Sequence, residues 1–180
     1  MGSVLPPPGC LRAFRVSPAE APELLLDTHT EWPNRFFSVG CRCGRAGFSL
    51  SGRIVHHALL GQKVVSGPVT ATCGSCRRAV LLFDPSRHGY DVEMQHFPPV
   101  AAPPGEPVGR FTCPGCGGPT FSLVARFEYP AALVEAFESG RAAGYPSHVG
   151  REQELFTWFT LAGRCTSCRL VTTVASCECA

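Results

Sequence analysis

Cysteines carry the clearest chemical signal in this chain of 180 residues, which holds eleven of them. All except Cys10 occur as close pairs, at positions 41 and 43, 73 and 76, 113 and 116, 165 and 168, and 177 and 179. Two thiolates separated by one or two residues can converge on a single cation from one tight turn, called a knuckle. The odd total argues against a framework of disulfides, so we interpret the pairs as metal ligands.

The sequence around these pairs is repeated in the second half of the chain. Residues 43–50 (CGRAGFSL) match residues 116–123 (CGGPTFSL) at both ends, and residues 73–78 (CGSCRR) match residues 165–170 (CTSCRL). The matching segments follow each other in the same order in both halves. This pattern predicts an internal duplication in which each half consists of a knuckle, a set of strands and a second knuckle, in that order.

Two knuckles brought together by a hairpin supply four thiolates, the tetrahedral ligand set of a structural zinc ion. The sequence therefore predicts two Zn²⁺ ions per chain. The first set is Cys41, Cys43, Cys73 and Cys76, and the second set is Cys113, Cys116, Cys165 and Cys168. Gly44 and Gly117 follow the second cysteine of a pair, where permissive backbone dihedrals are often needed.

Through these cysteines and the adjoining Gly or Arg, residues 41–76 and 113–168 each resemble the zinc-ribbon family. The first pair departs from the family as C-x-C. The knuckles are also separated by residues 44–72 and 117–164, more than the usual roughly 12 to 20 residues. We interpret these separations as extended hairpins with insertions. Rubredoxin-like iron sites resemble the chain less, because Arg77 and Arg169 stand where their second knuckle has Gly, so zinc is expected.

The elements that would position the knuckles are strands. Residues 48–60 and 121–129 alternate apolar and polar side chains with period two, which is typical of half-buried strands. Further segments rich in Val, Leu, Thr and aromatic residues predict strands at 64–72, 79–84, 155–164 and 169–176. Helix signals are a capping box at 17–20 and a short helix at 131–139 closed by Gly140. The predicted fold class is mainly β: two zinc-ribbon-like antiparallel β lobes with few short helices.

The predicted organisation has four parts. Residues 1–34 form an N-terminal extension with a short helix, and residues 35–96 form the first zinc-ribbon-like lobe. Residues 97–109 (FPPVAAPPGEPVG) are a stiff proline-rich connector, and residues 110–180 form the second zinc-ribbon-like lobe.

Residues 83–96 are the most polar segment of the first lobe and are an alternative place for chemistry. The side chains that could converge on a metal there are His88, Asp91, Glu93 and His96. We favour an exposed turn followed by an ordinary solvated strand. His56 and His57 would face opposite sides of a strand and cannot chelate one ion together, and we expect His56 in the core. The sequence contains no nucleophile elbow, phosphate loop or H-E-x-x-H motif, so no catalytic residues are expected.

Arginines crowd the knuckles, at positions 42, 45, 77, 78, 164 and 169. They could contact nucleic acid. Alternatively, they offset the net charge of about −2 of a zinc ion with four thiolates and donate hydrogen bonds around it. We favour the second interpretation, since the formal net charge of +2 is low for a nucleic-acid-binding protein. For Cys177 and Cys179 we expect burial near the end of the chain; a third metal site with Cys10 is the alternative.

These features predict a non-catalytic zinc-binding protein that acts as a protein–protein interaction module of adaptor, inhibitor or immunity type. A nucleic-acid-binding module that uses the knuckle arginines is the second hypothesis, and a metalloenzyme centred on residues 88–96 is the third. We expect a protein partner, with nucleic acid as the alternative and no membrane. The N-terminus lacks the pattern of a signal peptide, so a cytoplasmic location is expected.

Overall fold

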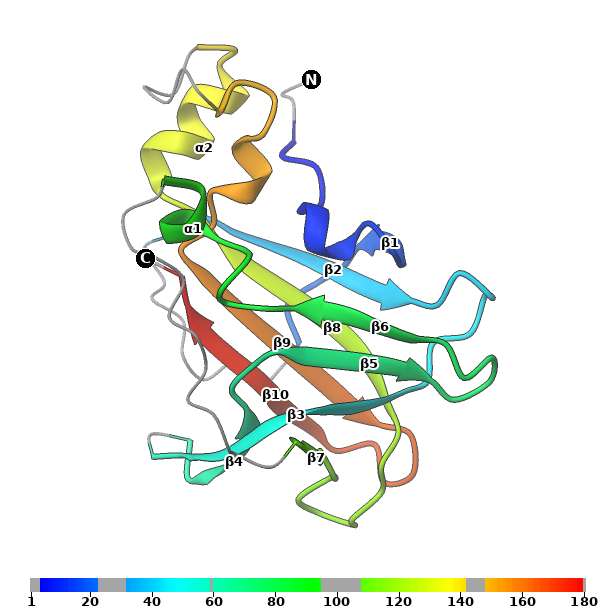
Figure 1. Cartoon of the computed structure of the whole chain (residues 1–180). Helices are drawn as coiled ribbons and strands as arrows, with labels where there is room; N and C mark the ends of the chain where they lie inside the picture. Colours follow the sequence, from blue (N-terminus) through cyan, green and yellow to red (C-terminus); the bar gives the residue numbers. More distant parts are fainter. Residues whose placement is uncertain (1–3, 23–31, 59, 95–107, 142–147, 180) are drawn as a thin grey trace.

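The computed structural model describes residues 4–22, 32–58, 60–94, 108–141 and 148–179. Its elements are mainly antiparallel strands, with two short α-helices (Figure 1). The strands are β1 (Arg15–Pro18), β2 (Asn34–Gly40), β3 (Phe48–His57), β4 (Gln62–Val65), β5 (Val69–Cys73), β6 (Ala79–Phe83), β7 (Val108–Arg110), β8 (Phe121–Glu128), β9 (Trp158–Cys165) and β10 (Val171–Glu178). The helices are α1 (Tyr90–Met94) and α2 (Ala131–Glu138), with 3₁₀ turns η1 (Gly9–Leu11) and η3 (Glu152–Glu154).

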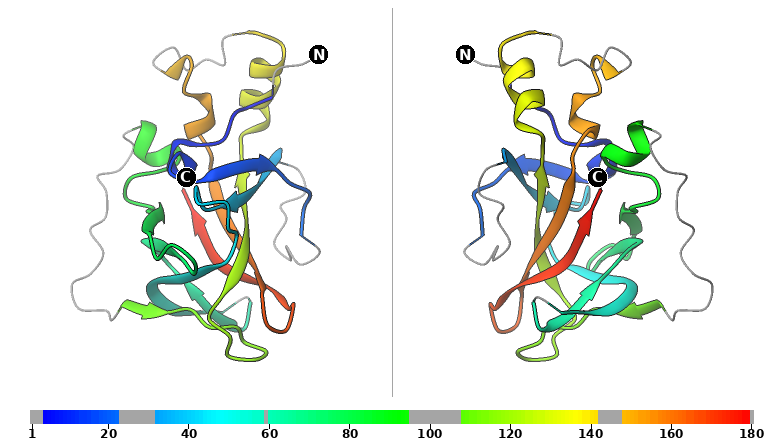
Figure 2. Two further views of the ribbon diagram at one scale, coloured as in Figure 1. Left: turned by 90° about the vertical axis from the view of Figure 1, so that its right-hand side faces the viewer. Right: turned by 90° about the vertical axis from the view of Figure 1, so that its left-hand side faces the viewer.

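All these strands belong to one sheet, which confirms the mainly β fold class. Its main order is β1-β2-β8-β3-β5-β6; β9 joins β8, β10 joins β9, and β4 and β7 join β3. The sheet is strongly twisted and curled, with α1 and α2 near its upper end and the β9–β10 turn at its lower end (Figures 1 and 2). Neither helix in the described part of the chain is long and apolar enough to cross a membrane.

The two halves of the chain exchange strands within this sheet. The strand before the first knuckle of each half pairs with the other half: β2 pairs with β8, and β7 pairs with β3. Phe48 in β3 pairs with Phe121 in β8, and these residues occupy matching positions in the two sequence repeats. Antiparallel pairing of matching residues places an approximate two-fold axis between them.

The ladders of the two halves have the same register. Phe48 lies opposite Cys73 in the first half, and Phe121 lies opposite Cys165 in the second. The β5–β6 and β9–β10 ladders each contain one irregularity, at which Leu82 and Val174 are passed over. Matching cysteines therefore occupy matching places in the two ladders.

Aromatic side chains from both halves form one core. The ring of Phe83 stacks on that of Phe159 with centroids 4.1 Å apart, and Phe127 meets Phe156 edge-on at 4.8 Å. One cluster of buried apolar residues contains members from both halves of the chain. The predicted four-part division stays a prediction, because most of the expected connector, residues 97–107, lies outside the described residues.

The helices agree only in part with the sequence. The helix expected at 131–139 is confirmed as α2, and Gly140 follows it with a φ of +67°. The helix expected to start at Ser17 is wrong for the described residues 15–22, because Arg15–Pro18 is strand β1, paired with β2. An edge strand tolerates Pro18, and pairing with β2 outweighs the local capping signal. Residues 23–31 lie outside the described residues.

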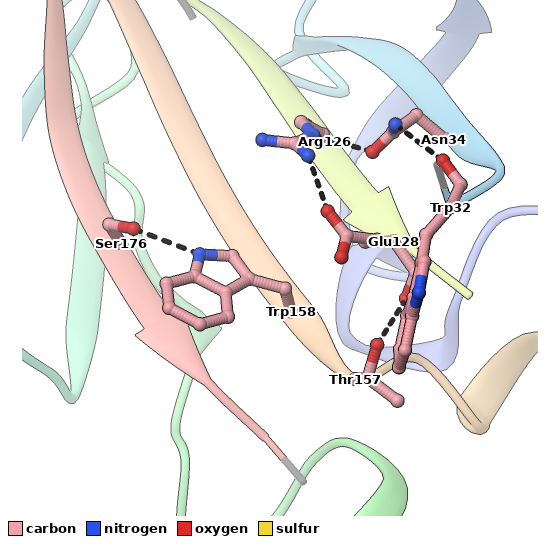
Figure 3. A network of polar contacts seen from close by, with 7 residues as sticks. All are labelled: Trp32, Asn34, Arg126, Glu128, Thr157, Trp158 and Ser176. Atoms are coloured by element: carbon pink, nitrogen blue, oxygen red, sulfur yellow. Dashed lines mark hydrogen bonds and ion pairs between the residues drawn. The ribbon is translucent and has the colours of Figure 1, made fainter. Parts of the chain in front are cut away.

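A charged pair is buried on the face of β8 that points away from the aromatic core. Only 1% of Arg126 and 4% of Glu128 is exposed. The guanidinium donates to the Glu128 carboxylate and to Oδ1 of Asn34 on neighbouring β2 (Figure 3). On β9, Nε1 of Trp158 donates to Oγ of Ser176 on β10, at 2.9 Å. Sequence alternation placed Arg126 and Glu128 on a polar face, but it did not predict that this face is covered.

Candidate metal centres

The four knuckles are built by the same two backbone hydrogen bonds. In the second knuckle, Cys73 N–H donates to the carbonyl of Arg78 at 2.9 Å, and Arg77 N–H donates back to the carbonyl of Cys73 at 3.0 Å. Corresponding bonds begin at Cys41, Cys113 and Cys165. Each turn therefore holds its two thiols on one side, including the first, which is shorter by one residue.

The residue after the second cysteine of every knuckle has a left-handed backbone. The φ angle is +89° at Gly44 and +72° at Gly117, which glycine adopts freely. At Arg77 and Arg169 the φ angles are +62° and +68°. A non-glycine residue in this region costs roughly 1 to 2 kcal/mol. The arginines in the second knuckle of each half therefore carry a conformational cost that glycine would not.

The knuckles bring together both predicted sets of cysteines. Within each set the sulfur atoms all lie within 4.8 Å of one another. The close Sγ–Sγ distances are Cys41–Cys76 at 3.5 Å, Cys43–Cys73 at 3.7 Å, Cys113–Cys168 at 3.5 Å and Cys116–Cys165 at 3.6 Å. Zn–S bonds of about 2.3 Å in a tetrahedron place sulfurs about 3.8 Å apart, whereas a disulfide needs about 2.05 Å. Each cluster can thus hold one metal ion and fits zinc.

Each cluster is partly buried at the protein surface. In each pair the first cysteine is buried and the second is exposed. The buried member lies at the end of the sheet, as Cys73 does in β5 and Cys165 in β9, while the exposed member lies in the turn. A bound ion would be anchored to the core and still be reachable by a chelator.

Hydrogen bonds from backbone amides lower the pKa of two of the cluster cysteines. The amides of Cys76 and Ser75 lower the pKa of Cys73 to about 6 against the opposing effect of burial. The amides of Cys168 and Ser167 do the same for Cys165, whose pKa is also about 6. Hydrogen bonds to a thiolate stabilise its charged form, which is the form that binds metal.

Cys41 titrates in the opposite direction. The amide of Cys43 acts to lower the pKa of Cys41, but burial and the neighbouring thiols outweigh it and raise the value to about 12. The pKa values of Cys41 and Cys73 thus shift in opposite directions within one cluster. A bound cation would favour the deprotonated form of both thiols, because metal ligation requires the deprotonated thiol.

The arginines near the knuckles are all exposed: Arg42, Arg45, Arg77, Arg78, Arg164 and Arg169. Within the described residues none of them donates a hydrogen bond to a cysteine sulfur, and the expected hydrogen bonds around a loaded zinc site stay a prediction. Arg42 instead donates to the carbonyl of Arg12 at 2.7 Å. The arginines can still offset the charge of a thiolate cluster through space.

The remaining cysteines lie apart from both clusters. The thiol of Cys177 donates to the carbonyl of Ser66 and that of Cys179 to the carbonyl of Cys177, both at 3.6 Å. Burial raises the pKa of Cys177 to about 12, and it also raises the pKa values of Cys10 and Cys179. Over the described ranges these three thiols join no group able to hold a metal.

We therefore expect Cys177→Ala combined with Cys179→Ala to leave the bound metal unchanged. Protonated, buried thiols contribute packing and no ligand, so only stability should fall, by about 1 to 3 kcal/mol. Metal analysis of the purified double variant beside the wild type checks this. A drop by one ion per chain would show that the ligands are assigned to the wrong cysteines.

The polar segment 83–96 is used structurally where it is described. Residues 90–94 form helix α1, so the expected strand is wrong there. His88 Nδ1 accepts a hydrogen bond from the amide of Asp84 at 3.0 Å, and burial lowers the pKa of His88. Glu93 pairs with Arg151 at 2.8 Å. The described members His88, Asp91 and Glu93 form no metal-binding group, and His96 lies outside the described residues.

One further expectation concerns a position in β3. His56 is exposed, so its predicted place in the core is wrong; β3 has left the core by that point and pairs with β4 instead. Of the aromatic residues near the start of β9, Phe156 and Phe159 are buried and Trp158 is half-buried.

Comparison with known proteins does not extend this picture. No family model matches the chain, and no curated protein or solved structure is significantly similar to it. Its function must therefore be inferred from the geometry of its own residues.

Proposed function

We propose that the chain binds two structural zinc ions and serves as a non-catalytic protein–protein interaction module in the cytoplasm. One observation carries the first part: each cluster offers four cysteine sulfurs within 4.8 Å of one another. Four thiolates complete a tetrahedron, and a catalytic zinc needs one position left open for water or substrate. The clusters therefore suit a role in holding the fold.

The matched halves support an origin by internal duplication. The repeats in sequence, the equal registers of the ladders and the pairing of Phe48 with Phe121 all relate one half to the other. A duplicated zinc-ribbon-like unit that has exchanged β2 and β7 accounts for all three. Zinc is preferred to iron because the second knuckle of each half has arginine and not glycine at its left-handed position.

The surface favours a protein partner. The formal net charge is only +2, which gives little long-range attraction to nucleic acid. Large apolar side chains are exposed at Leu81 on β6, Val108 on β7 and Leu170 beside the last knuckle. By analogy with small zinc-ribbon proteins, we propose a role of adaptor, inhibitor or immunity type. Capture from a native extract before and after nuclease treatment tests this, and the partner should remain after nuclease.

Nucleic acid is the second candidate, because every arginine beside the knuckles is exposed. If these side chains contact phosphates, affinity must fall steeply with salt as counterions are released. We expect no sub-micromolar binding of fluorescent single- or double-stranded DNA or RNA at about 50 mM salt. Arg78→Ala and Arg169→Ala should then change only metal retention or stability.

The opposite result is equally clear. Sub-micromolar binding at about 50 mM salt that collapses at about 200 mM, and that is lost in both arginine variants, would favour the nucleic-acid function over the protein partner.

A further inference from the structure

A cavity of about 270 Å³ lies between the first cluster and the β7–β8 connection. Its lining includes four residues with hydroxyl side chains, Ser49, Ser51, Thr72 and Thr120, and two arginines, Arg77 and Arg110. Among the described residues that line it, none is acidic. The described lining of the cavity therefore offers hydrogen-bond donors and positive charge, and it contributes no carboxylate to neutralise them.

The two arginines come from different halves of the chain. Arg110 ends β7, where it pairs with Ser51 of β3, and Arg77 lies in the second knuckle. Both are exposed, and in the described ranges neither makes an ion pair or a side-chain hydrogen bond. Both guanidinium groups are thus available to a ligand, and strand exchange between the halves brings them to one cavity.

Arg77 occupies its place at a conformational cost. Its φ of +62° is in the left-handed region, and glycine fills the corresponding position in the first knuckle of each half, at Gly44 and Gly117. A non-glycine residue held in this region is often associated with function. Arg169 has a similar φ of +68° in the other half, so this conformation alone does not mark a ligand site.

The matching cavity in the other half is different. It has a volume of about 440 Å³, and Ser38 and Val124 stand where the first cavity has Arg110 and Ser51. Glu20 and Arg164 both line it. Among the described lining residues, the first cavity thus has two arginines and no acid while the second has an acid, so this composition is not imposed by the fold.

We propose that this cavity binds a phosphate monoester. Guanidinium groups bind phosphate oxygens in bidentate fashion, and a monoester offers close to two negative charges and three acceptor oxygens. The volume is slightly below the roughly 300 Å³ at which drug-sized sites begin, so it suits a phosphate on a small group. A nucleic-acid strand needs a charged groove along its backbone, which two arginines do not supply. This inference goes beyond the proposed function and does not depend on it.

Calorimetric titration of the zinc-loaded chain with O-phosphoserine tests the proposal, with serine as the uncharged control. We expect saturable binding of phosphoserine and none of serine. Arg77→Gly should weaken binding on the order of 10- to 100-fold, the effect of losing one charge-assisted contact. Glycine fits the backbone at this position better than arginine, so the variant keeps its fold.

Arg169→Gly is the matched control. It makes the same change in the equivalent knuckle, but Arg169 lines neither of the two cavities. Its affinity for phosphoserine should equal that of the wild type, and Arg110→Gln should behave like Arg77→Gly. Equal losses in Arg77→Gly and Arg169→Gly, or no binding of phosphoserine, would overturn the proposal.

Two further ligands distinguish whether the phosphate monoester belongs to a protein or to a small molecule. A phosphoserine peptide that binds at least tenfold more tightly than free phosphoserine assigns the site to a phosphorylated protein. Equal affinities assign it to a small phosphorylated molecule. A single-stranded oligonucleotide without terminal phosphate has only diesters; if it competes as well as phosphoserine, the monoester assignment is wrong.

Discussion

Cys76→Ser and Cys168→Ser are each expected to release one zinc ion and to abolish cooperative unfolding of the sheet at ordinary temperature. Structural zinc contributes roughly 10 to 16 kcal/mol of apparent binding free energy. Whole domains are stable by about 5 to 15 kcal/mol, so the loss of one ion is comparable to the entire folding free energy. Circular dichroism during heating, combined with metal analysis of the same samples, measures both effects.

The sheet topology predicts that the damage spreads beyond the altered cluster. β2 from the first half pairs with β8, which leads out of the second cluster, and β7 pairs with β3 in the same way. Either variant should therefore disturb both halves, and the tail variant with both Cys177 and Cys179 changed is the control. If Cys76→Ser keeps two ions and a wild-type melting curve, the cluster does not hold the fold.

Arg126→Met is expected to destabilise the protein by about 3 to 5 kcal/mol. Methionine fills much of the space of arginine, but it removes the guanidinium that donates to the Glu128 carboxylate in a place that is 4% exposed. Breaking a buried pair by removing one partner typically has this cost, because a charge is left in a low-dielectric environment. Urea denaturation at neutral pH measures the difference.

The double variant Arg126→Met with Glu128→Leu supplies the control. Replacing both members of a buried ion pair with apolar groups is often neutral or stabilising. We therefore expect the double variant to recover most of the stability that the single variant loses. A double variant less stable than Arg126→Met alone would show that the Glu128 carboxylate has a structural role independent of the arginine.

The cysteine clusters could be derived from sequence because their signal is local and repeated. A pair of thiols in a tight turn is specified by spacing alone, and duplication of the flanking residues showed which pairs belong together. Strands β3 and β8 followed from period-two alternation, and β5, β6, β9 and β10 followed from segments rich in Val, Leu, Thr and aromatic residues, whereas β1, β2 and β7 were not predicted. The structure then brought Cys41 to Cys76 and Cys113 to Cys168 without any rearrangement of these sets.

What the sequence did not reveal depends on contacts between distant segments. Exchange of β2 and β7 between the halves leaves no mark in either strand alone, and it is this exchange that brings Arg110 to the cavity beside Arg77. The capping box at Ser17 predicted a helix, but this segment pairs with β2 as a strand. The burial of Arg126 depends on the residues that cover the polar face of β8. A charged pair two residues apart on one strand, Arg126 and Glu128, was the available signal for that network.

Metal content is the most direct test of the central claim. Protein expressed without added metal, purified and analysed by mass spectrometry of its elements, should contain two zinc ions per chain and no iron. Titration with a chromophoric thiol reagent measures the number of bound ions independently, because both ions should be released as the cluster cysteines react. A chain with a single zinc, or a red product loaded with iron, would contradict the assignment of two closed four-thiolate zinc sites.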